Sequence, residues 1–392
     1  MTDSDLSGNQ AITTVGFDNF GGALYNNGGT ATITGSTLAN NQALGGGSFS
    51  PFGGSGGGAV ENSGGAALMV TGCRFTGNLA MGADGQGYGS AGGALDNEFG
   101  SVANISSTEL IGNRAQPGPG DGGAEGGGGA IENEFAGSGS ILRVTNCSFS
   151  DNQAIAGAGG GIAFGGGIEN NGILSVSQST FDHNLARGGD GGTISEANRF
   201  IGLGFGGGLD NFFATATIDQ CVFTGNQAVG GSGGNGGNGA SQYDEDAALG
   251  GGVWNYFGSM TVSRSIFSYN QSIGGSNATV GTSGTGHVGD GGGGALDKEL
   301  GGTVTISDST FDHNQAIGGS NIQGNSNNFI AGWGHGGAIN NSSWNPIAVS
   351  APGAIPSILI ASNLTITNNQ AIGGAADTGP LAGVSLPEMI AA

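Results

Sequence analysis

Acidic residues recur at one position of a repeated phrase, and they are the residues of this chain best suited to ion binding or acid–base chemistry. The residue before the first asparagine of that phrase is acidic in five successive copies: Glu61, Asp96, Glu132, Glu169 and Asp210. The next two copies carry Trp254 and Asp297. Side chains alternate between the two faces of a strand, so we expect this row to point outward if neighbours such as Leu95 point inward.

A row of carboxylates at strand spacing is electrostatically unfavourable. Two unit charges about 4.8 Å apart repel each other by about 0.9 kcal/mol in water, and by more near a protein surface. Glu98 and Glu134 follow the row, and further acids stand in glycine-rich segments: Asp84, Asp121, Glu125, Asp190, Asp244, Glu245, Asp246 and Asp290. A set of ligands that is rich in oxygen atoms and poor in histidine suits Ca²⁺ rather than Zn²⁺. The row therefore predicts either a Ca²⁺-binding stripe or a solvated acidic face whose repulsion is screened.

Histidine and basic residues give a weaker signal. His183 and His313 occupy identical Phe-Asp-His-Asn phrases three repeats apart, too far from each other to act together. Gly334-His335-Gly336 resembles a tripeptide of the polygalacturonase family, but the Asn-Thr-Asp, Asp-Asp and Arg-Ile-Lys elements found with it there are absent from this sequence. The seven Lys and Arg residues are scattered and form no clamp for an acidic sugar.

Two repeated phrases must position these residues. The first is Gly-Gly-Ala-Leu-Asp-Asn at 92–97 and its copies, and the second ends in Asn-Gln-Ala or a near copy. Eight residues before the second asparagine stands a β-branched residue: Ile33, Val70, Ile105, Val144, Val176, Ile218, Val262 or Ile306. Three residues before it stands Leu38, Phe75, Leu110, Phe149, Phe181, Phe223, Phe267 or Phe311. This alternation predicts strands and no helices.

A repeat of about 24 residues cannot bury its apolar face alone, so neighbouring repeats must stack. Equivalent strands stacked in parallel give a solenoid with one coil per repeat. We therefore predict an all-β, right-handed parallel β-helix of about nine or ten coils over residues 1–372, with three short strands per coil. The handedness follows from the general rule for parallel crossovers. Residues 373–392 are expected to form a tail or a cap.

Stacking places the repeated asparagines in interior rows, where their amides would hydrogen-bond between coils. The first phrase supplies Asn26, Asn62, Asn97, Asn133, Asn170 and Asn211. The second phrase supplies Asn41, Asn78, Asn113, Asn152, Asn184, Asn226, Asn270 and Asn314. We expect these residues to be structural.

The repeats differ in length mainly between the second phrase and the next Gly-Gly pair. These segments are rich in glycine, as at 230–249 and 318–335. Insertions at one register leave a solenoid from one corner, so we expect a row of loops on one flank. Such loops are often a binding face, and equally they can be flexible filler. A further loop is expected at 345–356, between the two phrases of the last repeat.

The net charge is −22, which argues against nucleic acid or an anionic membrane as partner. No stretch approaches 18 apolar residues, so no membrane insertion is expected. The N-terminus reads as the second phrase of a repeat rather than a signal peptide, which suggests a piece of a longer protein or a mature region. Cys73, Cys147 and Cys221 fall in alternate repeats, too far apart for disulfides, and are expected to be buried replacements for serine.

The paired phrases resemble the repeats of chlamydial-type polymorphic outer-membrane proteins, and more broadly the β-helical passenger and adhesin domains of bacterial surface proteins. The resemblance runs from Asp3 to about Ile372. It implies a right-handed parallel β-helix of the pectate-lyase-like superfold, secreted or at a bacterial cell surface. We expect no translocator barrel after the repeats, and the glycine-rich insertions are longer than the plain repeat needs.

Together these features predict a non-enzymatic extracellular or cell-surface protein with a structural or adhesive role. Its expected partners are a second copy, stacked head to tail into fibres, or a surface glycan or protein. No cofactor is expected beyond Ca²⁺ on the acidic row. A polysaccharide lyase or glycoside hydrolase is the alternative. Ice binding is the third candidate, because Thr32, Thr217, Thr261 and Thr305 form an outward row that Met69 and Arg143 interrupt.

Overall fold

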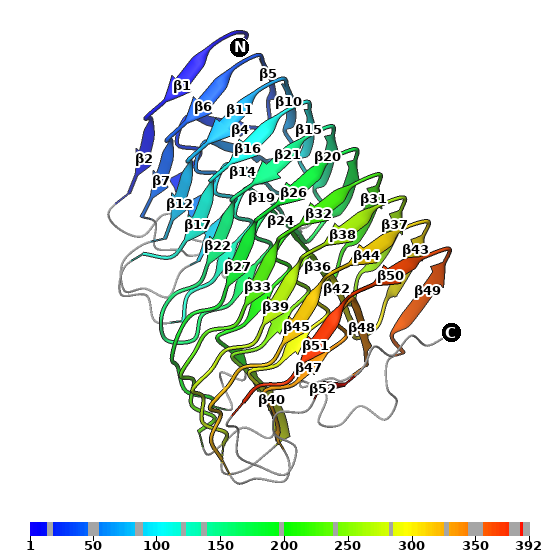
Figure 1. The fold of residues 1–392 in the computed structure, drawn as a ribbon. Coiled ribbons are helices and arrows are strands. Elements are labelled where there is room, and N and C mark those ends of the chain that lie inside the picture. The colour runs from blue at the N-terminus through cyan, green and yellow to red at the C-terminus, as the bar shows by residue number, and fades with distance from the viewer. Residues whose placement is uncertain are drawn as a thin grey trace.

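The chain forms a right-handed parallel β-helix whose coils stack along one axis (Figure 1). The computed structural model describes residues 1–392 except 14–18, 46–54, 83–88, 119–122, 135–138, 196–199, 238–241, 282–284, 325–328, 344–355, 376–384 and 387–392. The described residues contain strands and no helix. Five long sheets hold nine or ten parallel strands each, which confirms the predicted solenoid and its number of coils.

One coil shows how the sequence makes each circuit. It runs through β9 (Val60–Ser63), β10 (Ala67–Thr71), β11 (Arg74–Thr76), β12 (Leu79–Met81) and β13 (Ser90–Ala91). These strands belong to sheets that we name E, A, B, C and D in that order. Each coil thus contributes five strands instead of the predicted three. The two extra strands, in sheets C and D, are only two or three residues long, too short to show a period in the sequence.

Sheets A, B and E enclose the main core. Sheet A contains β5 (Thr30–Thr34), β10, β15 (Val102–Ser106), β20 (Ile141–Thr145), β25 (Ile173–Ser177), β31 (Thr215–Asp219), β37 (Ser259–Ser263), β43 (Thr303–Ser307) and β49 (Ile358–Ser362). Sheet B contains β1 (Asp5–Ser7), β6 (Thr37–Ala39), β11, β16 (Glu109–Ile111), β21 (Ser148–Ser150), β26 (Thr180–Asp182), β32 (Val222–Thr224), β38 (Ile266–Ser268), β44 (Thr310–Asp312) and β50 (Thr365–Thr367). Sheet E contains β4 (Leu24–Asn27), β9, β14 (Leu95–Asn97), β19 (Ile131–Asn133), β24 (Ile168–Asn170), β30 (Leu209–Phe212), β36 (Val253–Tyr256), β42 (Leu296–Glu299) and β48 (Ile339–Ser342).

Sheets C and D form an arm beside the main core. Sheet C contains β2 (Gln10–Ile12), β7 (Gln42–Leu44), β12, β17 (Arg114–Gln116), β22 (Gln153–Ile155), β27 (Leu185–Arg187), β33 (Gln227–Val229), β39 (Gln271–Ile273), β45 (Gln315–Ile317) and β51 (Gln370–Ile372). Sheet D contains β3 (Asn19–Phe20), β8 (Ser55–Gly56), β13, β18 (Gly126–Gly127), β23 (Ala163–Phe164), β29 (Gly204–Phe205), β35 (Ala248–Leu249), β41 (Gly291–Gly292), β47 (Gly334–His335) and β52 (Ser385–Leu386). Through β52, part of the expected tail or cap extends sheet D beside β47.

The main core consists of the predicted rows of aliphatic and aromatic side chains. Neighbouring coils pair residue by residue, so equivalent side chains lie directly above one another. Five phenylalanines stack with centroids 4.5–4.9 Å apart and planes within 5°: Phe149, Phe181, Phe223, Phe267 and Phe311. All three cysteines are buried and unbonded, as the spacing predicted.

Two amide ladders line the corners of this core. In the first, each Nδ2 donates to the next Oδ1 at 2.7–2.8 Å, linking Asn26, Asn62, Asn97, Asn133, Asn170, Asn211 and Asn255. In the second the distances are 2.8–3.0 Å, linking Asn41, Asn78, Asn113, Asn152, Asn184, Asn226, Asn270, Asn314 and Asn369. Each amide therefore satisfies a buried amide in the next coil.

A sharp turn at the first glycine of each Gly-Gly pair folds sheet D over the outer face of sheet E. Gly57 has φ +56°, and a Cβ there would lie 2.1 Å from the carbonyl oxygen of Val60. On its other face sheet D packs against sheet C, where small side chains such as Ala154 and Ala163 meet. This close packing requires glycine at Gly126, where a Cβ would lie 2.2 Å from the carbonyl oxygen of Ile155.

The glycine-rich segments leave the helix between sheets C and D, the single corner predicted. In four successive coils of the C-terminal half they build a further sheet, the side sheet: β28 (Phe200–Ile201), β34 (Gln242–Glu245), β40 (Thr285–Val288) and β46 (Phe329–Ala331). A small core that includes Ile194, Ile201, Val280, Val288 and Ile322 packs with it. The described parts of these four segments therefore form a sheet with a small core of its own. The expected loop at 345–356 lies almost wholly outside the described residues.

Candidate functional site

The outer face of sheet E and the facing side of sheet D enclose a second interior, which we call the outer compartment. One side is lined by the residue before the first-phrase asparagine, and the other by the last residue of each sheet D strand. Gly56, for example, faces Glu61, because a Cβ at Gly56 would lie 2.6 Å from its Oε2. Along the helix axis the lining changes from acidic to aromatic to a mixture of His and Asp.

The acidic section contains the predicted row, now in register on adjacent strands: Glu61, Asp96, Glu132, Glu169 and Asp210. Of the two alternatives for this row, a Ca²⁺-binding stripe and a solvated acidic face, the solvated face is wrong. The side chains do point away from the main core, but the exposed fraction of each residue is at most 7% because sheet D covers them. Glu98 and Glu134 are buried beside them. The glycine turn that covers the row could not be inferred from strand alternation.

Burial and mutual repulsion disfavour the ionised form of these carboxyls. Desolvation, followed by the charges of Asp96 and Glu98, raises the pKa of Glu61 well above its usual value. Desolvation also raises the pKa of Glu169 to about 8. The pKa of Asp210 is raised by burial and then by Glu169. At neutral pH the row must therefore hold protons, or cations in their place.

The first part of the acidic section fits a hard cation. Glu61, Asp96 and Glu98 each place a carboxylate oxygen within 4.8 Å of the others. Both oxygens of Glu61 are buried, no N–H group among the described residues donates to them, and the neighbouring Glu98 carboxyl interacts with this side chain. Oxygen-only ligand sets of this kind suit Ca²⁺. Of the predicted loop acids, Asp84 and Asp121 lie outside the described residues, and Glu125 is exposed.

The aromatic section begins where Trp254 replaces the acidic residue. Its indole ring stacks on Phe205 of the facing strand, with centroids 3.9 Å apart and planes 8° apart. Tyr256 and Phe212 extend the cluster along sheet E, and Phe164 joins it from sheet D. In the sequence, Trp254 is notable only because it interrupts the row of acidic residues. Nothing in the repeat indicated that Phe205 and Phe164, at the ends of glycine-rich segments, would pack against it.

Lys298 replaces the asparagine in the next coil of the first amide ladder. It is fully buried, and its Nζ donates to the backbone carbonyls of Glu299, Leu300 and Gly301. Burial lowers the pKa of this amine to about 8, against the opposing effect of Asp297 and Glu299. Its neighbour Asp297 continues the outward row, and burial raises the pKa of that carboxyl to about 7.

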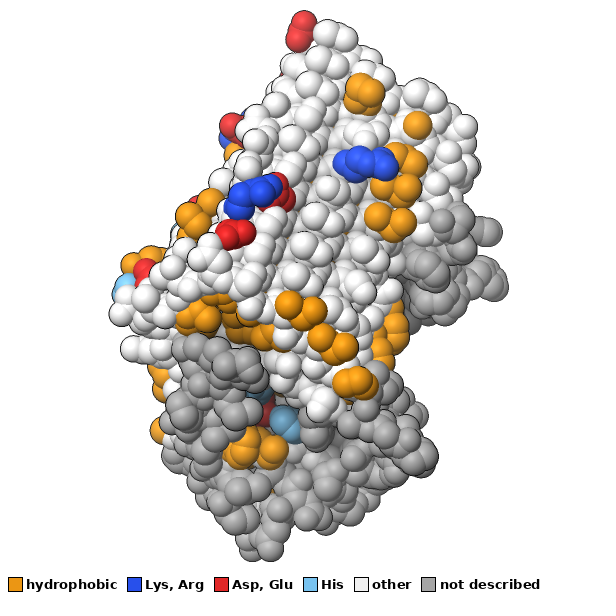
Figure 2. Space-filling model, turned by 90° about the vertical axis from the view of Figure 1, so that its right-hand side faces the viewer, with side chains coloured by type: hydrophobic (Ala, Val, Ile, Leu, Met, Phe, Trp, Pro, Cys, Tyr) orange, Lys and Arg blue, Asp and Glu red, His pale blue; other side chains and the backbone are white. Residues whose placement is uncertain are grey.

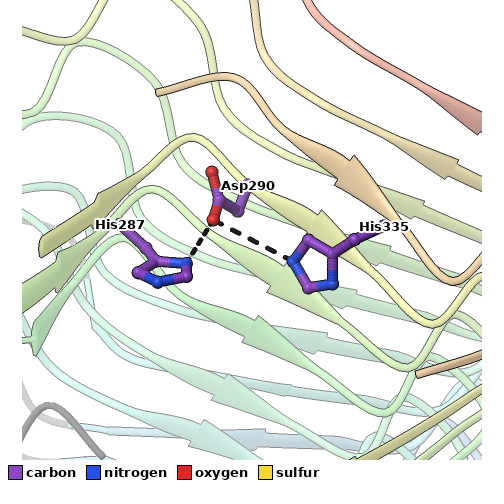
Figure 3. Close-up of side chains that lie close together, drawn as sticks. All are labelled: His287, Asp290 and His335. Atoms are coloured by element: carbon purple, nitrogen blue, oxygen red, sulfur yellow. Dashed lines mark hydrogen bonds and ion pairs between the residues drawn. The ribbon is translucent and has the colours of Figure 1, made fainter. Parts of the chain in front are cut away.

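At the C-terminal end of the compartment, two histidines converge on one carboxylate (Figure 3). His287 Nδ1 is hydrogen-bonded to Asp290 Oδ2, and His335 Nε2 lies 3.9 Å from the same oxygen. The Asp290 side chain is 1% exposed, whereas His287 and His335 retain 17% and 15%. Burial lowers the pKa of His287, but the charges of Asp290 and Asp244 and the hydrogen bond to Asp290 together raise it above its usual value; for His335, burial lowers the pKa.

The sequence singled out His335 and Asp290 separately and missed His287. His287 lies in a glycine-rich insertion, and the strand pairing that places it beside the other two residues is visible only in the side sheet of the structure. His183 and His313, the other two histidines, are exposed on sheet B beside Asp182 and Asp312, three coils apart as expected.

No helix of the length and apolarity needed to cross a membrane occurs among the described residues. Comparison with protein-family models, with curated proteins and with solved structures found no match to this chain.

Proposed function

We propose that this protein is a non-enzymatic β-helix, secreted or displayed at a bacterial cell surface, with a structural and adhesive role. The observation that carries this proposal is the broad face of sheet A. Its nine strands contain two charged residues, Arg143 and Asp219, and apart from Met69 and Asn104 otherwise present hydroxyl, small and aliphatic side chains in straight rows. Figure 2 views this face, where charged side chains are sparse.

A rigid, weakly charged face suits contact with an extended neutral surface, such as a glycan layer or a protein array. The rows of adjacent coils are in register, as Thr217, Thr261 and Thr305 illustrate. The buried acids support a non-enzymatic role. The carboxyl groups whose pKa is raised well above the usual value lie beneath sheet D, where a bulky substrate does not reach them.

The test is adhesion of the purified chain to immobilised glycans and matrix proteins. Thr217→Glu/Thr261→Glu should abolish retention on the matching surface and lower the melting temperature no more than the control variant does. The control is Thr224→Glu/Ser268→Glu, which places the same charges at adjacent coils of sheet B. Equal retention of both variants would contradict adhesion through sheet A. The release of reducing ends from a polysaccharide panel would support the hydrolase or lyase alternative.

Ice binding is the second candidate, and the in-register row of Ser175, Thr217, Thr261 and Thr305 favours it. Met69 and Arg143 interrupt the same row in earlier coils. A thermal-hysteresis measurement separates this candidate from adhesion, since adhesion requires no effect on ice growth.

End-to-end assembly would extend the structural role. Among the described residues β1 and β50 pair on one side only, and such strand edges are templates for pairing. Sedimentation of the 392-residue chain over a concentration series tests this, with Ca²⁺ and with a chelator. A monomer throughout the series would exclude assembly of this chain under those conditions.

A further inference from the structure

We propose that His287, Asp290 and His335 form a binding site for a divalent transition-metal ion, with Zn²⁺ as the preferred ion. The site lies where the side sheet meets sheet D. His287 belongs to β40 of the side sheet, Asp290 to the turn that leads from β40 into β41, and His335 to β47 of the next coil. The proposal concerns metal binding and stands independently of the adhesive role.

The three ligand atoms already converge. One ring nitrogen from each histidine and one Asp290 oxygen lie within 4.8 Å of one another. The 3.9 Å from His335 Nε2 to Asp290 Oδ2 is too long for a hydrogen bond. Two ligand atoms on a tetrahedral Zn²⁺ with bonds of about 2.0–2.2 Å lie about 3.4 Å apart, so a movement of about 0.5 Å would bring this pair to coordination distance. Nε2 of His335 is buried and has no hydrogen-bond partner among the described residues.

The donor set selects the class of metal. Two imidazole nitrogens and one carboxylate oxygen suit Zn²⁺ and its neighbours in the first transition row, whereas Ca²⁺ prefers oxygen ligands throughout. The acidic section offers the opposite set, with oxygens and no nitrogen. The two ends of the outer compartment therefore differ in the ion that they would accept.

Neighbouring groups hold the ligands in place, as outer-shell residues do at metal sites. The backbone N–H of Trp333 donates to Asp290 Oδ1 at 3.2 Å, which directs Oδ2 toward the histidines. The Asn340 side chain interacts with the His335 ring and donates to Asp297 Oδ2 at 3.0 Å. Asp244 pairs in register with His287, so a further carboxylate stands close to the site.

The site also has room and access. A Cβ at Gly292 would lie 2.5 Å from Cε1 of His335, so glycine at this position leaves space for the imidazole. Both histidine side chains keep some exposed surface although their Nε2 atoms are buried, so the site lies just beneath the surface, and three protein ligands leave a coordination position for water. A bound ion would fasten the side sheet to sheet D across two adjacent coils.

The experiment is isothermal titration of the full chain with Zn²⁺ and with Ca²⁺, combined with thermal melts. We expect one Zn²⁺ per chain and a rise in melting temperature that EDTA reverses. His287→Asn/His335→Asn should lower Zn²⁺ affinity at least 100-fold. His183→Asn/His313→Asn, which removes the two exposed histidines, should leave it unchanged. Equal affinity in the two double variants, or loss of binding only in the control, would overturn the proposal.

A spectroscopic measurement on the unaltered chain covers the case in which the site variant fails to fold. Co²⁺ added in place of Zn²⁺ should broaden the imidazole NMR signals of two of the four histidines and give visible bands without sulfur charge transfer. Broadening of the other two histidines, or a charge-transfer band from the buried cysteines, would place the metal elsewhere. The absence of any Co²⁺ effect would refute the site.

Discussion

The main core and the outer compartment share the strands of sheet E, but they tolerate change very differently. On the inward side, successive coils carry Val60, Leu95, Ile131, Ile168, Leu209, Val253 and Leu296, all aliphatic and buried. On the outward side the row changes from acids to Trp254 and back to Asp297. The inward position must fit against sheets A and B in every coil, whereas the outward position must fit only the facing residue of sheet D.

That facing residue changes together with the row. Gly56 and Gly127 lie against carboxylates, Phe205 stacks on Trp254, and a Cβ at Gly292 would meet both Asp297 and His335. The main core therefore supplies the fold, and the outer compartment supplies chemical differences along the axis. Substitutions on the two sides of sheet E should separate these contributions.

The largest effect is expected in the main core. Phe223→Ala removes a fully buried ring stacked between Phe181 and Phe267, and should lower the free energy of unfolding by about 3–5 kcal/mol. Phe205→Ala, the matched change in the outer compartment, should have a smaller effect because its neighbours are less completely enclosed. Urea unfolding followed by circular dichroism measures both values. An equal loss would mean that the compartment stabilises the fold as much as the main core does.

Breaking an amide ladder comes next. Asn170→Ala leaves Nδ2 of Asn133 without its Oδ1 acceptor and removes the donor to Asn211. We expect a loss of about 1–3 kcal/mol for each buried group left unsatisfied. Gln271→Ala, which breaks an amide row on the outer side of sheet C, is the control and should have a smaller effect because water can replace the contact.

The acidic section should make stability fall as pH rises. Its carboxyls have folded pKa values above their unfolded values, so their contribution is complete below about pH 4 and is lost as pH rises through the folded values, about 8 for Glu169. Asp210→Asn removes one of these groups and should raise the free energy of unfolding at pH 9 by about 1–2 kcal/mol, with little change at pH 4.

The control is Asp219→Asn. A hydrogen bond from Ser263 and the nearby Arg264 lower the pKa of Asp219, so its loss should be slightly destabilising at neutral and high pH. If Asp210→Asn has no effect at pH 9, cations rather than protons neutralise the row.

The smallest effect is that of Ca²⁺. At a free concentration ten times the Kd, a single site in the acidic section stabilises the folded chain by about 1.4 kcal/mol. Glu61→Gln should reduce this gain, whereas Trp254→Phe in the aromatic section should not. Thermal melts at pH 8 with Ca²⁺ and with a chelator measure it. A Ca²⁺ response that survives Glu61→Gln would move the cation site away from the first coils.

The repeat carried enough information to predict the fold and the ladders, because Ile33, Phe75, Asn62 and their equivalents recur at fixed spacing in nearly every coil. It could not predict the outer compartment, because the position of sheet D depends on a left-handed turn at residues such as Gly57. Alternation correctly predicted that Glu61 lies on the outward face of its strand, but it could not exclude a solvated acidic row, which the burial of Glu61 contradicts. His287 was missed because it lies in a glycine-rich insertion whose sequence does not repeat from coil to coil.

Because every strand in the five long sheets pairs with its counterpart one coil away, a complete repeat can be added or removed without changing any row of side chains. Each such event alters the length of the rod by one coil, about 4.8 Å, and leaves its cross-section unchanged. The length of the β-helix can therefore change in uniform steps of one coil. The histidine site at one end and the acidic section at the other would then be held apart by a distance that the number of coils sets.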